Sequence, residues 1–330
     1  MSTRAFIERR KTSTPVALAA ISAPLVIQRA GPQAEKIFWQ FFTAEHSNRN
    51  TRLAYLRAAR RFFDWCAVNN IGLVDVEPVH VAAYIETLGQ QLSVPSVKQH
   101  LAAIRNLFDY LIRGQIVAIN PAAAVRGPRH SVKRGKTPVL NSEELRELID
   151  SIDVSNPVGL RDRALIGVMV YTFARVSAAV GMLVEDYYSQ KKRSFLRLHE
   201  KGGKYHQVPA HLTVQEYLDE YLEAAGIADD PKSPMFLAAK RGRGRKSLSE
   251  NALTRETALR VIKKVAKKAG LPPQICNHTF RGSGITVYLK NGGTIEKAAA
   301  IAAHESTRTT QLYDRTEDGL TVEEIDKISF

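Results

Sequence analysis

Residues 126–138 divide the chain into two regions with different sequence patterns. This segment reads Arg-Gly-Pro-Arg-His-Ser-Val-Lys-Arg-Gly-Lys-Thr-Pro, which combines turn-forming residues with five Lys or Arg and almost no apolar side chains. A chain of 330 residues is long enough to form two domains of moderate size. We therefore predict a basic interdomain linker here, either a solvated tether or a segment that contacts an anionic partner.

The region before the linker has the pattern of a compact helical domain. Apolar residues recur at helical spacing along two stretches, with basic residues among them. Pro78 and Pro95 stand where new helices can begin, and Asn120 followed by Pro121 disfavours further helix. We predict a module of about four or five helices over residues 33–125.

The region after the linker mixes helices with a β-hairpin. Asn141 and Glu144 have the spacing of a capping box at the start of a helix. Residues 195–199 and 205–209 have strand-like patterns and are joined by a turn that contains glycine. The predicted fold class is mainly α with a small antiparallel β-sheet, and residues 139–317 form the second domain.

Two longer helices are predicted on either side of this hairpin. The first runs from about Leu160 towards Arg175, so Arg175 is expected at the end of a buried helix. The second runs from about Asn251 to Ala269 and stops at Gly270.

The N-terminal 32 residues admit two interpretations. Basic residues precede an apolar stretch from Pro15 to Ile27, which has some of the character of a weak secretory signal. Pro24 follows the only plausible cleavage site, so a flexible arm over residues 1–32 agrees better with the remaining chain.

The chain is strongly basic and carries enough apolar residues for folded cores. It has 47 Lys and Arg against 33 Asp and Glu, a net charge of +14, and 44% hydrophobic residues. These values favour a polyanionic partner, and nucleic acid over a membrane, because no apolar run approaches the roughly 20 residues of a membrane-spanning helix. Cys66 and Cys276 lack the spacing of a zinc site. We expect a cytoplasmic protein without a metal site.

Six residues of defined types follow one another in a fixed order through the second region. They are Arg175, a lysine at the hairpin, His278, Arg281, His304 and Tyr313, which lies nine positions after His304. The spacing of three makes His278 and Arg281 neighbours on one helical face. Each residue alone has an ordinary structural explanation, but their joint order on helix end, hairpin, helix and terminal helix is far more specific.

In this order of residues the chain resembles the tyrosine recombinase family, which includes phage integrases, Xer recombinases and transposon integrases. The family motif near the first arginine usually reads Gly-Leu-Arg-Ile-Ser-Glu-Leu, and residues 172–179 here read Thr-Phe-Ala-Arg-Val-Ser-Ala-Ala. The family's Gly-Lys-Gly-x-Lys pattern aligns its first lysine with Lys201 in Glu-Lys-Gly-Gly-Lys, with Lys204 as the alternative. The closing box, usually Leu-Gly-His-x-x-x-x-Thr-Thr-x-x-Tyr, is matched by His304 and Tyr313.

The resemblance implies a site-specific recombinase or integrase that cleaves DNA through a 3′-phosphotyrosyl intermediate and exchanges strands through a four-way junction. The implied roles are nucleophile for Tyr313, phosphate clamp for Arg175 and Arg281, proton acceptor for His278, general acid for Lys201 and hydrogen-bond donor for His304. Neither a metal nor ATP is required, and we find no carboxylate cluster or phosphate-binding glycine loop.

Three of the positions that depart from the family pattern lie close to predicted catalytic residues in the sequence, and none of them removes a catalytic side chain. Ala178 replaces the acidic residue that commonly follows the first arginine, Gly282 replaces a frequent polar residue, and Ala303 replaces the glycine before His304. The first departure leaves the orientation of Arg175 unexplained.

The expected partner is double-stranded DNA, held in a clamp of two domains and bound by a tetramer on paired sites, with accessory recombinase proteins as further partners. We expect the protein to be associated with the nucleoid. Candidate DNA contacts are basic residues of both domains and of the linker: Arg57, Arg60, Lys98, Arg105, Lys133, Arg134, Lys204, Arg241, Arg243, Lys263 and Lys267. The amphipathic tail, residues 318–330, either caps its own domain or, as the resemblance suggests, docks on a neighbouring protomer.

Two other functions are compatible with much of this pattern. A type IB topoisomerase shares the chemistry, but the compact helical module and the short box from His304 to Tyr313 favour a recombinase. A DNA-binding protein that keeps the fold without catalysis is disfavoured, because every catalytic residue type is present.

Overall fold

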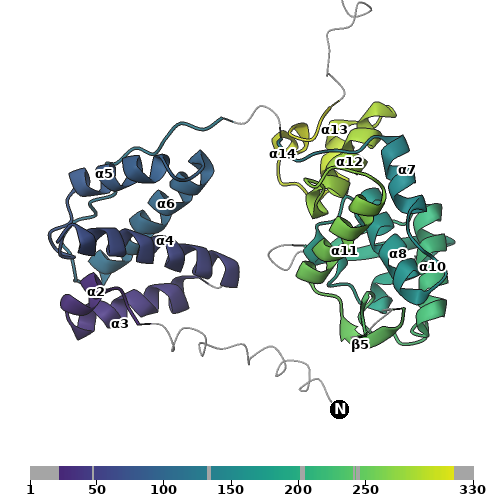
Figure 1. Cartoon of the computed structure of the whole chain (residues 1–330), viewed down its shortest axis with the longest axis horizontal. Helices are drawn as coiled ribbons and strands as arrows, with labels where there is room; N and C mark the ends of the chain where they lie inside the picture. The colour runs from purple at the N-terminus through teal and green to yellow at the C-terminus, as the bar shows by residue number, and fades with distance from the viewer. Residues whose placement is uncertain are drawn as a thin grey trace, which may run out of the picture. The chain divides into compact units, whose positions relative to one another are not determined.

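The computed structural model describes residues 22–46, 48–131, 135–200, 205–240, 242 and 246–315. The chain divides into two compact units, Met1–Ser131 and Val132–Phe330 (Figure 1). The division falls within the segment 126–138 that the sequence analysis assigns to the linker.

The first unit is helical. Its elements are α2 (Leu25–Arg29), α3 (Pro32–Gln40), the π-helical turn η2 (Phe41–Glu45), α4 (Arg49–Val68), α5 (Pro78–Gly89) and α6 (Val94–Arg113). Proline occupies the first turn of α3, α5 and α6, where its missing N–H has no intrahelical partner to lose. The core is rich in phenylalanine, and Phe38, Phe62, Phe63 and Phe108 are almost completely buried within it.

The prediction of a flexible arm is wrong for residues 22–32. Residues 25–29 form helix α2, and Ala23, Val26 and Ile27 are buried in the core of the first unit, where α2 contacts α4. Burial of these apolar side chains stabilises a helix that is too short to be stable alone. Residues 1–21 lie outside the described residues.

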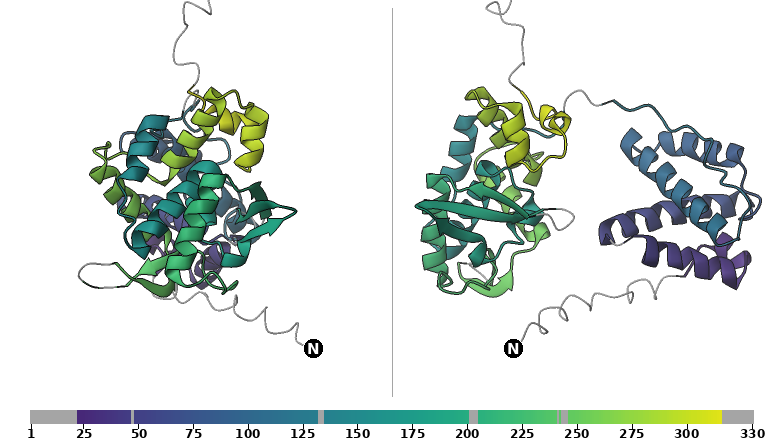
Figure 2. Two further views of the ribbon diagram at one scale, coloured as in Figure 1. Left: turned by 90° about the vertical axis from the view of Figure 1, so that its right-hand side faces the viewer. Right: turned by 180° about the vertical axis from the view of Figure 1, so that it is seen from behind.

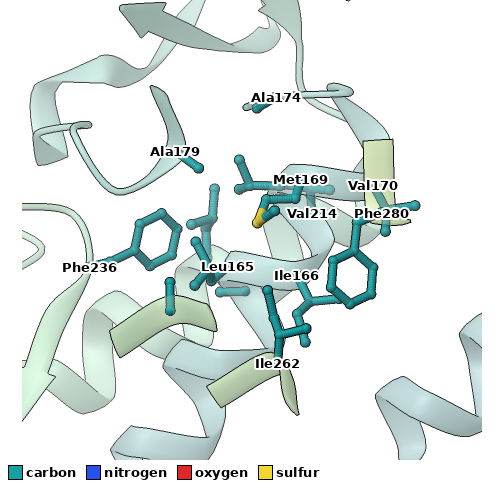
Figure 3. Packing of buried hydrophobic residues seen from close by; sticks show 14 of the residues in the cluster. Leu165, Ile166, Met169, Val170, Ala174, Ala179, Val214, Phe236, Ile262 and Phe280 are labelled. Atoms are coloured by element: carbon teal, nitrogen blue, oxygen red, sulfur yellow. The ribbon is translucent and has the colours of Figure 1, made fainter. Parts of the chain in front are cut away.

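The second unit is built around one central helix, α8 (Pro157–Tyr171). This helix is buried on nearly all sides, and its residues Leu165, Ile166 and Met169 pack with Phe236 and Phe280 from later parts of the chain (Figure 3). The other helices of this unit are α7 (Ser142–Asp150), α9 (Val176–Ala179), α10 (Leu212–Ala225), α11 (Arg255–Lys268), α12 (Asn277–Lys290), α13 (Ile295–Ile301) and α14 (Thr307–Gln311).

Helix boundaries in this unit follow local capping. The predicted capping box at the start of α7 is confirmed, since Asn141 Oδ1 accepts from the Glu144 amide and Glu144 accepts from the Asn141 amide, both at 2.8 Å. The predicted start of the later helix near Asn251 is wrong. Residues 248–252 form a strand instead, and Thr254 caps α11 by accepting from the Thr257 amide at 3.2 Å.

Among its described residues, the second unit also contains two small antiparallel sheets (Figure 2). The first contains β1 (Tyr187–Gln190), β2 (Arg193–His199) and β3 (Tyr205–Pro209), preceded by the 3₁₀ turn η3 (Val184–Asp186), and the second pairs β4 (Leu237–Ala239) with β5 (Leu248–Ala252). The predicted hairpin is confirmed, with His199 opposite Tyr205. The sequence analysis did not predict β1, β4 or β5.

Within the part of the chain that the structure describes, no helix has both the length and the apolar character needed to span a bilayer.

Candidate active site

Arg281 lies at the centre of a cluster of polar side chains in the second unit. It is only 1% exposed, and α12 carries it three residues after His278. Its Nη2 donates to the Ala302 carbonyl at 2.6 Å, and its Nη1 donates to the Phe173 carbonyl. Two buried backbone acceptors from different segments therefore fix the plane of this guanidinium.

Both of these carbonyls belong to sharp backbone turns. Phe173 has φ +54°, and Ala303, which follows Ala302, has φ +48°, a left-handed region that favours glycine. Ala303 closes a Schellman motif at the end of α13, in which the amides of Ala303 and His304 donate to Ala300 and Ala299. When the first arginine is aligned with the family motif, Phe173 falls on its glycine, as Ala303 does in the closing box. The left-handed backbone at these two positions explains why the family usually has glycine there.

The ring of Phe173 is accommodated by a glycine on the facing helix. A Cβ atom at Gly284 would lie 2.2 Å from the Val170 carbonyl oxygen and 2.8 Å from Cδ1 of Phe173. Phe173 also contacts Tyr288, with ring centroids 6.0 Å apart. The chain therefore combines a strained backbone at Phe173 with a closely packed side chain at the same position.

Arg175 is more exposed than Arg281 and has a side-chain partner. It follows α8 and caps α9 at its N-terminus, and its side chain is 34% exposed. Its Nη1 lies 2.5 Å from Oε2 of Glu200, whose side chain is 6% exposed. Glu200 follows β2 directly, and the sequence analysis assigned it no role. It supplies the acidic partner that Ala178 lacks, so the open question about the orientation of Arg175 is answered by a residue 25 positions later.

Two histidines flank the guanidinium groups. Desolvation by the surrounding protein, followed by the charges of Arg281 and Arg175, lowers the pKa of His278 below its ordinary value. The same causes lower the pKa of His304 to about 4. Both imidazoles are therefore neutral at neutral pH, and Nδ1 of His304 is within hydrogen-bond distance, 2.8 Å, of Thr310 Oγ1.

Tyr313 stacks on His304. Their ring centroids are 6.0 Å apart and the planes differ by 5°. The tyrosine ring lies beside Gly282, where a Cβ atom would be 3.2 Å from its Cδ1, and the Tyr313 carbonyl accepts from Thr286 Oγ1 at 2.7 Å. The departure at Gly282 thus makes room for the tyrosine ring.

The backbone around Tyr313 is also tied to the segment at the end of the linker. The Gly135 amide donates to the Leu312 carbonyl at 2.9 Å, and Arg315 donates to the Gly135 carbonyl at 2.5 Å. A Cβ atom at Gly135 would lie 2.6 Å from the Leu312 carbonyl oxygen, so the close approach requires glycine.

The structure brings five of the six predicted catalytic residues into one cluster: Arg175, His278, Arg281, His304 and Tyr313. Lys201 and its alternative Lys204 lie outside the described residues. The hairpin that carries them is held near this cluster by His206, a residue that the sequence analysis did not identify. Its Nε2 donates to the Ile301 carbonyl at 2.8 Å.

The predicted DNA contacts have different surroundings. Arg57, Lys98 and Lys267 are exposed and Arg60 is half-buried. Arg105 instead donates to the carbonyls of Ala122 and Val125, which indicates a structural role in fixing the segment after α6. Lys263, although exposed, donates to the Pro273 carbonyl. The remaining candidates lie outside the described residues: Lys133, Arg134, Lys204, Arg241 and Arg243.

Among the described residues, no three or more His, Cys, Asp or Glu side chains gather in a way that could hold a metal ion.

Comparison with known proteins identifies both units. Residues 138–319 match the model of the phage integrase family, and residues 36–115 match the N-terminal SAM-like domain of phage integrases. The tyrosine recombinase XerD of Corynebacterium glutamicum is 32% identical over 276 residues, which cover 80% of this chain and 86% of the relative.

Solved structures have the same fold at lower sequence identity. The XerH site-specific recombinase bound to its difH substrate in a pre-cleavage complex has a TM-score of 0.63 and 19% identity, covering 90% of this chain and 84% of XerH. A lambda integrase from a tetramer bound to a Holliday junction has a TM-score of 0.61 and 16% identity, covering 92% of this chain and 84% of the integrase.

Proposed function

This chain belongs to the phage integrase family and is a tyrosine site-specific recombinase, and from that premise we propose that Tyr313 is the nucleophile that cuts and rejoins DNA. The single observation that carries this assignment is the stacking of Tyr313 on His304 within reach of the charge of Arg281. An ordinary surface tyrosine would not be expected to stack on a neutral imidazole beside a buried guanidinium.

The cleavage step transfers a phosphoryl group from one oxygen to another. The phenolic oxygen of Tyr313 attacks the scissile phosphorus, a Tyr–O–P bond forms, and the bond from phosphorus to the 5′ oxygen breaks. His278 accepts the phenolic proton, and its lowered pKa leaves the imidazole unprotonated, and so able to accept, at neutral pH. Lys201 or Lys204 protonates the departing 5′ oxygen.

Negative charge develops on the non-bridging oxygens during this step. Arg175 and Arg281 bind these oxygens, and the neutral imidazole of His304 donates a further hydrogen bond to one of them. Because Arg281 is held by two carbonyls before DNA arrives, little reorganisation is required at the transition state. The phosphotyrosyl bond keeps the energy of the broken phosphodiester, so a 5′ hydroxyl from another strand can reverse the reaction.

We also propose that both units bind one DNA duplex and that four copies assemble on paired sites. The net charge of +14 supports an extensive phosphate interface. The fold shared with a lambda integrase that forms a tetramer on a Holliday junction supports the assembly. Strand exchange through a four-way junction, association with the nucleoid in the cytoplasm and the participation of accessory proteins follow from the same proposal.

The test is to capture covalent protein–DNA adducts. Fragmented genomic DNA of the organism that carries this gene is incubated with the protein, denatured adducts are retained on a filter, and their DNA is sequenced to identify the site. A nicked suicide duplex carrying that site should then give a denaturant-resistant adduct that Tyr313→Phe abolishes. Tyr288→Phe, which removes another phenolic hydroxyl from the same unit, should leave the adduct unchanged. Adducts that persist in Tyr313→Phe would overturn the assignment.

A further inference from the structure

Two departures from the family pattern in this chain concern the same arginine. The acidic residue that commonly follows the first arginine is replaced by Ala178, which is completely buried. The glycine that opens the family's hairpin pattern is replaced by Glu200. Compared with the family pattern, this chain lacks a carboxylate three residues after Arg175 and has one at position 200, directly after β2.

We propose that Glu200 is a positioning residue for Arg175 and takes over the task that an acidic side chain at position 178 performs elsewhere in the family. The proposal rests on the catalytic role assigned to Arg175 in the proposed function. It goes beyond that role because it identifies what holds the guanidinium in the orientation needed to bind phosphate.

The geometry of the pair favours positioning. Nη1 of Arg175 lies 2.5 Å from Oε2 of Glu200, and the Glu200 side chain is 6% exposed, so water screens the interaction poorly. Only one of the Arg175 nitrogens contacts this carboxylate, which leaves the rest of the guanidinium fork to bind phosphate.

The backbone that precedes Glu200 is held in a sheet. Glu200 follows the last residue of β2, and His199 is paired with Tyr205 in β3 at this end of the hairpin. His206 in β3 donates to the Ile301 carbonyl, next to the Ala302 carbonyl that holds Arg281. The position of Arg175 therefore depends on the sheet in which β2 and β3 pair.

Glu200 also acts on the second guanidinium. Burial is the largest cause that lowers the pKa of Arg281, and the charge of Arg175 lowers it further, whereas Tyr313 and Glu200 raise it. The Glu200 carboxylate therefore lies within the field of both cations. Two like charges in a poorly solvated cluster repel each other, and the carboxylate offsets this repulsion until phosphate binds.

A competing interpretation assigns Glu200 the opposite effect. A carboxylate on Arg175 resembles a phosphate, and it would slow cleavage if DNA had to displace it. The two interpretations predict opposite signs for the loss of Glu200: slower cleavage if Glu200 positions Arg175, and equal or faster cleavage if it competes with DNA.

The experiment measures single-turnover cleavage of the nicked suicide duplex at saturating DNA, together with the Kd for that duplex. We expect Glu200→Ala to slow cleavage roughly 10- to 100-fold because a displaced catalytic group loses much of its effect. The Kd should stay the same or become tighter, since a negative charge has been removed. Glu200→Asp should recover part of the rate. Glu185→Ala removes a more exposed ion pair, with Lys232, from the same unit and should leave the rate unchanged.

Relocating the carboxylate gives an independent test. The double variant Ala178→Glu with Glu200→Gly should cleave at least tenfold faster than Glu200→Gly alone. If burial of the new carboxylate prevents folding, the comparison of Glu200→Ala with Glu200→Asp still decides. Equal or faster cleavage by Glu200→Ala overturns the proposal. A wild-type protein that forms no adduct contradicts the proposed function instead, so the two failures are distinguishable.

Discussion

Arg281 and Arg175 carry the same functional group but are held in different ways. Arg281 is 1% exposed and donates to two backbone carbonyls, whereas Arg175 is 34% exposed and pairs with the side chain of Glu200. The first arrangement depends on where the fold places two turns. The second depends on a single carboxylate, which a mutation at another position of the chain can also supply.

This difference explains which departures from the family pattern the chain tolerates. Loss of an acidic residue at position 178 is accommodated, because Glu200, which follows β2, pairs with Arg175. The two turns beside Arg281 both lack the glycine of the family pattern. Phe173 and Ala303 adopt left-handed backbone conformations, although side chains are disfavoured there.

The largest effects are expected when each of the two arginines is replaced with lysine, which tests whether they are held in different ways. Arg281→Lys should slow cleavage of the suicide duplex by about 100-fold or more, since a point charge cannot reproduce a planar fork. It should also lower the free energy of unfolding by about 1–3 kcal/mol, because at least one buried carbonyl loses its donor. Single-turnover cleavage and urea denaturation measure the two effects.

Arg175→Lys is the matched control. Cleavage should again be slow, but the loss of stability should stay below about 1 kcal/mol, because the lysine keeps a positive charge beside Glu200. Equal losses of stability in the two variants would show that the two arginines are not held differently.

The next largest effect is expected at the strained turn before Arg175. Phe173→Ala should destabilise the second unit by about 3 kcal/mol, because a buried ring is lost. Phe173→Gly removes still more side chain but relieves the left-handed backbone, and it should be more stable than the alanine variant by about 1 kcal/mol. Thermal denaturation of both variants provides the comparison.

Phe280 is the control for the prediction that glycine is tolerated better than alanine at position 173. It is equally buried but lies inside α12, where glycine is disfavoured. Phe280→Gly should therefore be less stable than Phe280→Ala, and the same order at position 173 would contradict the strain that we assign to it.

The two arginines also show which features of the site could be predicted from the sequence and which could not. The order of the catalytic residues, the hairpin and the capping box at Asn141 depend on local patterns and on residue types, and they were predictable. The Arg175–Glu200 pair and the carbonyls around Arg281 join segments far apart in the chain, and no local pattern encodes them. Glu200 directly precedes Lys201 in the family motif, which was the one signal that pointed to it.

Elements that were missed are short or depend on tertiary contacts. Helix α2 has five residues and β4 has three, too few for a periodic pattern to be recognised. Arg105 looked like a basic residue on the surface of a helix, but its acceptors lie 17 and 20 residues later. Charge alone does not distinguish a DNA contact from a structural donor.

Burial of His304, together with the charges of Arg281 and Arg175, predicts a dependence of stability on pH. Folding lowers the pKa of His304 from its ordinary value of 6.5 to about 4, so between these values the unfolded chain binds a proton that the folded chain does not. The free energy of unfolding should therefore fall as the pH falls through this window. His304→Gln should show a shallower fall in urea denaturation at a series of pH values. Parallel curves for the two proteins would contradict the assignment.

The smallest effect is expected at the other turn beside Arg281. Ala303→Gly removes a methyl group from a left-handed position without leaving a buried cavity, so it should raise the free energy of unfolding by about 1 kcal/mol. Ala300→Gly, at an exposed position within α13, should lower it by about 0.5–1 kcal/mol. The Ala302 carbonyl keeps its place in the Schellman motif, so the cleavage rate of Ala303→Gly should be unchanged. If Ala303→Gly is more stable but cleaves more slowly, strain at this turn contributes to the position of Arg281. If the rate is unchanged, the two hydrogen bonds from Arg281 to backbone carbonyls account for that position alone.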